Sequence, residues 1–249
     1  MDMYFEAAAI GGLVGFLVAS LGIGAGAIAT PLLILTGIPP LQAVGSNLLF
    51  ALPLKAFTST LYRRRGEVDT ARVKHLLLGS LPALLASYLV LSQLSTLNLE
   101  LLSRAVKTLI GLTLIAVSAQ YLVKPPLSSN PAKAKPGHLA LTGFAVGALT
   151  LLTSVGSGVI VMAALLRLKT PPRKAVGTTL LYSLTVTAIA ALLHYTLKTI
   201  NPALTLTLLS TSIPTAYLGF KAAMKLPREK LLRTITLAIM ALGALTILT

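Results

Sequence analysis

Long apolar segments constrain this chain more than any other feature of its sequence. Most hold about 20 residues, and an α-helix of that length spans the roughly 30 Å of hydrocarbon in a bilayer. Only 11% of the 249 residues are charged and the mean hydropathy is +0.86, whereas a soluble domain carries about 25% charged residues. The sequence therefore predicts an all-α polytopic membrane protein, and it excludes an ordinary soluble globule and a disordered chain. The predicted segments are 5–21, 27–36, 42–62, 75–92, 101–123, 138–153, 159–168, 175–197, 202–224 and 231–249.

Two of these segments, 27–36 and 159–168, are only ten residues long. At about 1.5 Å of rise per residue, each covers about half a bilayer. Each follows a break rich in glycine or serine, 22–26 (GIGAG) in one case and 154–158 (SVGSG) in the other. We therefore expect two hairpins, each interrupted at membrane depth by a non-helical tip.

The sequence repeats itself at an offset of 132 residues. Residues 11–49 align without a gap on residues 143–181, and 15 of the 39 positions are identical, including five glycine pairs and two proline pairs. Apolar bias alone would match some leucines and alanines, but it would not align glycines and prolines in register. We therefore predict two membrane repeats, residues 1–123 and 138–249, joined by a polar cytoplasmic linker at 124–137.

Basic residues indicate how the two repeats are oriented. Seventeen of the 21 lysines and arginines lie in four connections between segments, and the positive-inside rule places such connections in the cytoplasm. Both termini are then outside, and the two repeats have opposite orientations, each with one broken hairpin and three transmembrane helices. Many secondary transporters are built from inverted repeats with broken helices. Because the net charge of +15 reflects topology, the expected partner is the lipid bilayer and not nucleic acid.

The hairpin tips are the first candidate binding site, for a small anionic substrate. Non-helical backbone at membrane depth is tolerated only where it is buried in protein or lines a wet cavity, and helix N-termini offer N–H donors to anions. The start of the next full helix, after a double proline, adds neutral polar groups in both repeats. The alternatives are close packing of small residues, which we favour for the glycines at 11, 15, 143 and 147, and ordinary helix–helix hydrogen bonds. The candidate substrate-binding residues are Gly24, Gly26, Ser154, Gly156, Ser157 and Gly158 at the tips, and Gln42, Ser46, Asn47, Thr178 and Thr179 at the helix starts.

Lys55 is a further candidate for substrate binding, because it lies inside segment 42–62. A charge within a membrane segment is costly and marks a functional site by default. The alternative is that the lysine extends to the membrane surface, or snorkels. Its counterpart in the second repeat is Thr187, so the charge is not duplicated.

The interior of the predicted segments lacks the residues that most catalysis requires. The six acidic residues lie at segment ends or in loops, cysteine is absent, and the three histidines are far apart in sequence. We place His194 near the membrane surface. Catalytic carboxylate pairs and metal sites have no candidates, so we expect no catalytic residue, no metal and no cofactor. Because sodium- and proton-coupled carriers commonly bury a carboxylate, we also expect no obligatory sodium and no carboxylate proton relay.

The two copies of the tip motif resemble the TauE/SafE sulfite exporter family, also called the toluene-sulfonate uptake permeases. The first copy is GIGAG at 22–26 followed by PPLQAVGSNL at 39–48, and the second is GSG at 156–158 followed by RKAVGTTL at 173–180. The resemblance covers essentially the whole chain and implies transport of sulfite, sulfonates or sulfoacetate.

We therefore expect a plasma-membrane permease for a small sulfur-containing anion. Export is favoured, because an anion that leaves a cell with a negative interior moves down the electrical gradient. A passive anion channel and an intramembrane enzyme acting on a lipid phosphate are the alternatives.

Cysteine labelling tests the predicted orientation. The chain has no cysteine of its own, so a single introduced cysteine is labelled against no background. Ser128→Cys, in the predicted linker, should react only with reagent on the cytoplasmic side, and Thr249→Cys only with external reagent. Labelling of both positions from one side would contradict the inverted arrangement.

Overall fold

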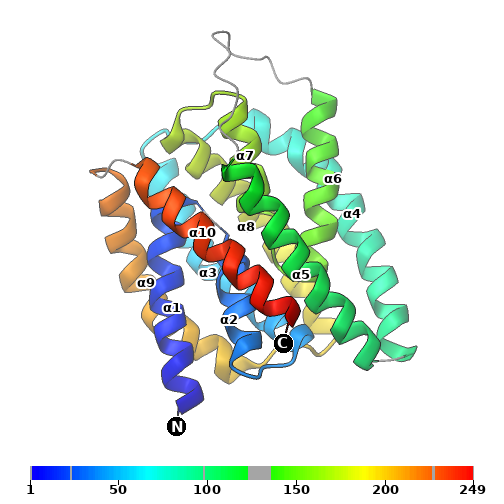
Figure 1. Ribbon diagram of the computed structural model, residues 1–249. Helices are drawn as coiled ribbons and strands as arrows, with labels where there is room; N and C mark the ends of the chain where they lie inside the picture. Colours follow the sequence, from blue (N-terminus) through cyan, green and yellow to red (C-terminus); the bar gives the residue numbers. More distant parts are fainter. Residues whose placement is uncertain (1, 23, 98, 123–135, 226–227, 249) are drawn as a thin grey trace.

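The computed structural model describes residues 2–22, 24–97, 99–122, 136–225 and 228–248 (Figure 1). These residues form ten α-helices and one short 3-10 helix, η1, and none of them is in a strand. The elements are α1 (Asp2–Leu21), η1 (Ala25–Ala27), α2 (Ala29–Leu35), α3 (Pro40–Arg63), α4 (Thr70–Leu97), α5 (Leu99–Leu122), α6 (Pro136–Thr153), α7 (Val159–Arg167), α8 (Pro172–Thr196), α9 (Pro202–Ala223) and α10 (Arg228–Leu248).

Each predicted apolar segment corresponds to one of these helices, and the two short segments are the short helices α2 and α7. Six helices are long and apolar enough to cross a membrane: α1, α4, α5, α6, α8 and α9. The prediction of an all-α polytopic membrane protein is thereby confirmed. The predicted linker at 124–137 lies outside the described residues except for its last two, which begin α6, and the division into two repeats stays a prediction.

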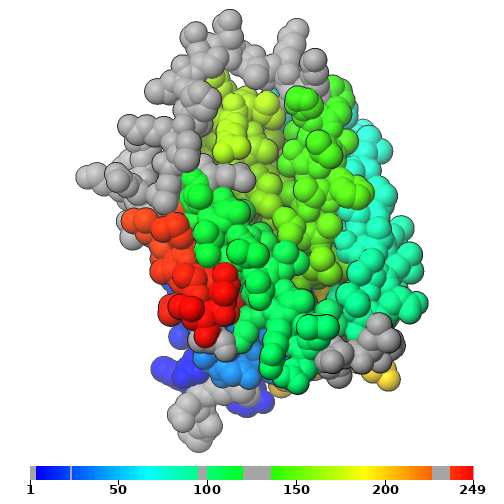
Figure 2. Space-filling view, turned by 45° about the vertical axis from the view of Figure 1, so that its right-hand side comes forward, coloured from blue at the N-terminus to red at the C-terminus, as the bar shows by residue number. Residues whose placement is uncertain are grey.

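Helices α3 and α8 form the centre of the bundle. They pack against each other, while α9 and α1 lie on the α3 side and α4 and α6 on the α8 side. The α5–α10 pair crosses in front of them in Figure 1, and Figure 2 shows α10 against α5 on one face of the molecule. Large apolar side chains are exposed on the outer helices, as at Leu78, Leu101 and Leu141, which suits a surface that faces lipid tails.

Contacts between helices recur with the two halves exchanged. A Cβ added to Gly11 of α1 would lie 2.1 Å from the carbonyl oxygen of Leu208 in α9, and one added to Gly143 of α6 would lie 2.0 Å from that of Leu76 in α4. Gly143 lies 132 positions after Gly11, and Leu76 lies 132 positions before Leu208. The glycines therefore let helix backbones touch, the packing role that the sequence favours for them.

The directions of the helices are visible in Figure 1. Helix α1 rises from the lower end of the view, whereas α6 descends from the upper end, and α10 ends at the end where α1 begins. Helices α1 and α6 thus run in opposite directions, while the inverted repeat as a whole stays a prediction. The membrane side on which each end lies stays a prediction.

Two adjacent glycines of α1 provide a matched test of this packing. Gly11→Ala should lower the thermal unfolding midpoint in detergent, because the new methyl group would overlap the Leu208 carbonyl; overpacking of this kind costs about 1–3 kcal/mol. Gly12→Ala should leave the midpoint nearly unchanged, because its Cβ would lie 3.7 Å from the nearest atoms, in Thr211 and Thr215. Equal midpoints for the two variants would contradict this account of the helix contact.

Candidate functional site

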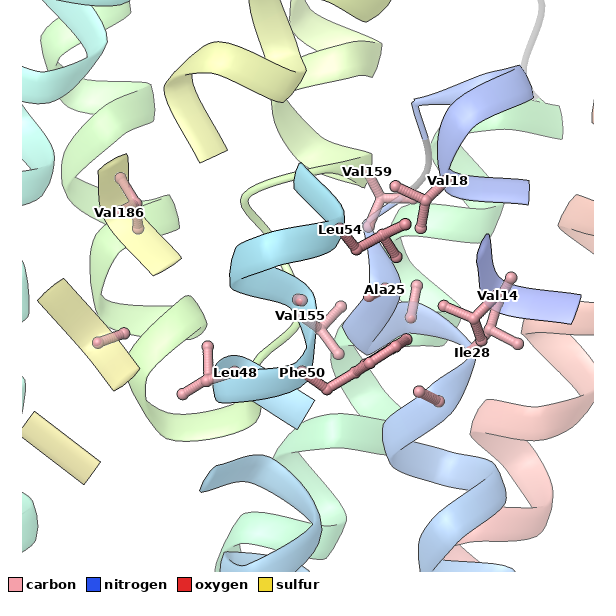
Figure 3. Packing of buried hydrophobic residues seen from close by; sticks show 14 of the residues in the cluster. Val14, Val18, Ala25, Ile28, Leu48, Phe50, Leu54, Val155, Val159 and Val186 are labelled. Carbon is pink, nitrogen blue, oxygen red and sulfur yellow. The ribbon is translucent and has the colours of Figure 1, made fainter. Parts of the chain in front are cut away.

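The two hairpin tips meet inside the bundle. A Cβ added to Gly24 would lie 3.1 Å from the backbone nitrogen and Cα of Gly158, and one added to Gly26 would lie 2.0 Å from the carbonyl oxygen of Ser154. The tips therefore touch through their backbones, and side chains at these positions would separate them. Figure 3 shows Val155 of the second tip near Ala25 of the first and Phe50 of α3.

Hydroxyl groups hold the second tip in its turn. Ser154 has a φ of 57° and Gly156 one of 122°, both in the left-handed region. The Ser154 hydroxyl donates to the carbonyl oxygen of Thr153 (2.6 Å) and accepts from the hydroxyl of Thr30 in α2 (2.5 Å). The Thr153 hydroxyl accepts from the backbone N–H of Val155 (3.1 Å). Because Thr30 lies in the first half of the chain, this bond also joins the two hairpins.

Lys55 of α3 reaches the second tip. Its side chain is 3% exposed, and its Nζ donates to Oγ1 of Thr187 in α8 (2.6 Å) and lies 3.4 Å from Oγ of Ser157. The ammonium is thus buried in the protein and does not extend to the membrane surface. Thr187 is the counterpart of Lys55 at the 132-residue offset, so equivalent positions of the two halves bond to each other.

No carboxylate pairs with Lys55 within the described residues. The two ion pairs found there are Arg72–Asp69 and Arg104–Glu100, each within a single helix or its first turn. Lys55 is also the one lysine, arginine or carboxylate among the fully buried side chains that the structure describes. A buried cation with only neutral partners lowers the stability of a fold. Here such a cation lies where α3, α8 and the second tip meet.

Ser46 and Thr178 have a structural partner each. The Ser46 hydroxyl accepts from the backbone N–H of Asn201 (2.9 Å), and the Thr178 hydroxyl accepts from the backbone N–H of Asp69 (2.9 Å). These two bonds are equivalents at the 132-residue offset. Asn201 and Asp69 in turn cap the next helices, α9 and α4, through the backbone N–H groups of Leu204 and Arg72. The two hydroxyl oxygens therefore hold the residues that cap the next helices, and a role of Ser46 or Thr178 in binding stays a prediction.

Three other candidates lie along α3 and α8. Asn47 is 1% exposed, and its Oδ1 has no hydrogen-bond partner among the described residues. Thr179, its counterpart, is fully buried, and its hydroxyl lies 3.9 Å from Sδ of Met162 in α7. Gln42 is half-buried at the start of α3. The structure thus brings together a tip cluster of Gly24, Gly26, Ser154, Ser157, Gly158 and Lys55. Among the described residues, no hydrogen bond joins Gln42, Ser46, Asn47 or Thr178 to this cluster.

The sequence interpretation missed Thr187 and Thr30 as members of the site, and it missed the contacts of His194. Thr187 could have been found, because it is the residue that the repeat pairs with Lys55. His194 is fully buried in the protein, two residues before the end of α8, and its position relative to the membrane surface stays a prediction. Its Nε2 donates to the carbonyl oxygen of Leu151, near the end of α6 (2.9 Å), and its Nδ1 lies 2.8 Å from Oγ1 of Thr199.

His194 has an equivalent in the first half of the chain, offset by 132 residues. There the hydroxyl of Tyr62 donates to the carbonyl oxygen of Ala19, near the end of α1 (2.9 Å). Each residue therefore anchors the helix turn that precedes a tip.

A polytopic helical bundle with two broken hairpins that meet around a buried charge has the architecture of a membrane permease. The sequence model described as sulfite exporter TauE/SafE matches residues 7–247, and the chain belongs to this family. It is also 28% identical over 219 residues to "Probable membrane transporter protein YjnA" of Bacillus subtilis (strain 168), a match that covers 84% of this chain and 86% of the relative.

The family and this relative are membrane transporters, which confirms the expected class and excludes the enzyme alternative. The protein is a multi-pass membrane transporter that moves a small-molecule substrate across a lipid bilayer.

Alanine substitutions separate the structural hydroxyls from the tip cluster. Ser46→Ala should lower the free energy of unfolding by about 1 kcal/mol, because the partly buried N–H of Asn201 loses its acceptor. Substrate affinity should stay unchanged, as judged by a binding titration. The control is Ser210→Ala on the exposed face of α9, whose hydroxyl bonds within its own helix, and which should change neither quantity. A Ser46→Ala protein that is fully stable but binds substrate weakly would return Ser46 to the binding site.

Proposed function

We propose that this transporter carries small sulfur-containing anions of the sulfite, sulfonate or sulfoacetate type, that it exports them, and that it lies in the plasma membrane with both termini outside. The observation that carries the anion assignment is the buried ammonium of Lys55, which has no carboxylate partner among the described residues. An anion bound at this place supplies the missing countercharge. The sulfur chemistry rests on the family to which the chain belongs.

The second tip adds a further attraction for an anion. Helix α7 begins at Val159, directly after Ser157 and Gly158. The N-terminus of a helix carries about half a positive charge, and here it lies next to the residue that Lys55 contacts. Lysine, hydroxyl and helix terminus therefore all favour negative charge at one place.

The proposed export is supported by the charges that are absent from the buried side chains of the described residues. The buried side chains described by the structure include no aspartate or glutamate, the residues on which sodium and proton coupling commonly depend. An anion leaving a cell with a negative interior gains about 2.3 kcal/mol per charge for each 100 mV. The membrane potential alone is then sufficient to drive export, with no coupling ion.

Transport into proteoliposomes tests this function. With a voltage set by potassium and valinomycin, flux of sulfite and of methanesulfonate should follow the imposed potential without added sodium and without a pH gradient. The flux should saturate with concentration and be accelerated by anion on the opposite side, because a carrier exposes one site at a time.

Two results would contradict the proposal. Flux that ignores the voltage but requires a sodium or proton gradient would show a coupling that the proposal denies. Flux that neither saturates nor responds to anion on the opposite side would favour the passive channel. Protein-free liposomes under the same voltage give the background rate.

A further inference from the structure

We propose that Arg65, Arg173 and Lys221 form a binding site for the phosphate group of an anionic phospholipid, at the end of α9. This end of α9 lies at the top of Figure 1, where α6 also begins. The site is separate from Lys55 and the tips, so it goes beyond the proposed function. Three observations carry it: the contacts of the cations, the apolar surface beside them, and the residues at the equivalent place in the other half of the chain.

Two of the cations are held over aromatic rings of α9. The guanidinium of Arg65, two residues after the end of α3, lies 5.4 Å from the ring centroid of Phe220. The ammonium of Lys221 lies 4.4 Å from the ring centroid of Tyr217. Both distances are within the roughly 6 Å at which a ring face attracts a cation. The rings therefore favour defined positions for two charges that are exposed.

The third cation, Arg173, reaches the same end of α9 from the first turn of α8. Its Nη2 donates to the carbonyl oxygen of Met224, which directly follows the last residue of α9 (2.9 Å). The residues involved at this end are three or four positions apart, so they lie along one side of the helix: Tyr217, Phe220, Lys221 and Met224. At about 1.5 Å per residue, they extend over about 10 Å. Cations from three parts of the chain thus gather along one short stretch of α9.

No carboxylate among the described residues pairs with these cations. The loop that carries Arg65 also holds Glu67 and Asp69. Asp69 pairs with Arg72, and Glu67 forms no ion pair with a described residue. Aromatic rings and a carbonyl oxygen leave the full charge of each cation in place. This end of α9 therefore attracts a group that brings negative charge.

The surface beside the cations is apolar and exposed. Residues 202–223 are long and apolar enough to cross a membrane, and Tyr217 and Leu218, in the last two turns of this span, are 44% and 57% exposed. Tyrosine is enriched where a membrane span meets the lipid headgroups. A ligand bound here meets an apolar surface on one side and cations on the other. A phospholipid, with acyl chains and a phosphate group, has both features, whereas a soluble ion has only one.

An anionic phospholipid suits this place better than a zwitterionic one. Both kinds carry a phosphate group, which arginine and lysine side chains bind. A zwitterionic headgroup also brings a positive charge, which would lie beside three cations of the protein. Each basic residue at a membrane surface strengthens the attraction for anionic lipid by about fivefold. Three of them are therefore sufficient for a clear preference.

The equivalent place in the other half of the chain has no charge. At the 132-residue offset, the three cations correspond to leucines: Leu41, Leu89 and Leu197. Since the two halves share close helix contacts, packing of the bundle does not require charge at these positions. The positive-inside rule accounts for basic residues at one end of the protein, but not for their placement on the rings and a carbonyl oxygen of one helix. A ligand specific to this end accounts for both.

Native mass spectrometry of the purified full-length protein tests the site, with phosphatidylglycerol and phosphatidylcholine of identical acyl chains as probes. The wild-type protein should bind its first phosphatidylglycerol at least about tenfold more tightly than phosphatidylcholine. Arg65→Gln and Lys221→Gln should each weaken phosphatidylglycerol binding by about fivefold. The matched control is Lys74→Gln, which removes an exposed lysine of α4 and should leave this affinity unchanged.

Tyr217→Leu distinguishes a positioned cation from charge alone. This variant keeps every charge and introduces the leucine that the other half has at the equivalent position, Leu85. Loss of the ring beneath Lys221 should weaken phosphatidylglycerol binding by about twofold or more. If Arg65→Gln does not fold, Lys221→Gln and Tyr217→Leu decide the proposal, because both residues are exposed on α9.

Three results would overturn the proposal. Equal affinities of the wild-type protein for the two lipids, or unchanged phosphatidylglycerol binding in Lys221→Gln, would leave the cations as topology signals only. An equal loss of affinity in Lys74→Gln would show unspecific attraction between a basic protein and an anionic lipid. Displacement of the lipid by glycerol 3-phosphate, which has no acyl chains, would show a site for soluble phosphate esters; we expect no displacement.

Discussion

A break in a membrane helix exposes backbone N–H and C=O groups that lipid cannot hydrogen-bond, and the rest of this structure depends on how those groups are covered. Here each break is covered largely by the other. The tip at 22–26 packs against the tip at 154–158 through glycine and serine backbone, and hydroxyls from Thr30 and Thr153 bond within the second tip. Helices α3 and α8 then enclose the pair, and the remaining helices separate this core from lipid.

The sequence predicted the helices well because their determinants are local. Segment length, glycine-rich breaks and double prolines placed the short helices at 27–36 and 159–168, and the structure has them at Ala29–Leu35 and Val159–Arg167. Depth in the bundle was not predictable in this way. His194 lies near a helix end, but its burial depends on a contact with α6, at the carbonyl oxygen of Leu151, which the sequence around it does not indicate.

Partners of the polar candidates also depend on distant segments. The sequence makes Ser46 a binding candidate because it is a neutral donor just inside a helix. Its hydroxyl oxygen accepts a bond from the backbone of Asn201, 155 residues away, and its role in binding stays a prediction. The repeat helps here, because a contact in one half implies the equivalent contact in the other half. The bond between Ser46 and Asn201 thus implies the bond between Thr178 and Asp69. The same reasoning pairs Lys55 with Thr187. The offset shows that the charge of Lys55 is not duplicated, and it also marks which residues meet.

This pairing shows where the two halves have the same contacts and where their residues differ. The two halves share helix contacts, caps and anchoring bonds, such as Tyr62 to Ala19 and His194 to Leu151. They differ at the centre, where one half supplies a charge and the other a hydroxyl. A second lysine at position 187 would place two ammonium groups within hydrogen-bond distance, where like charges repel strongly. A central position shared by both halves therefore tolerates one cation and requires a neutral partner.

The backbone contact between the tips has a consequence for motion. Interdigitated side chains must change rotamer before two packed surfaces can slide or part, and each such change adds to the barrier. At Gly24 and Gly158 there is no side chain to interdigitate, so these surfaces behave as smooth faces. Separation of the hairpins along this seam would need no rotamer change at these two glycines, but it would break the hydrogen bond between Thr30 and Ser154.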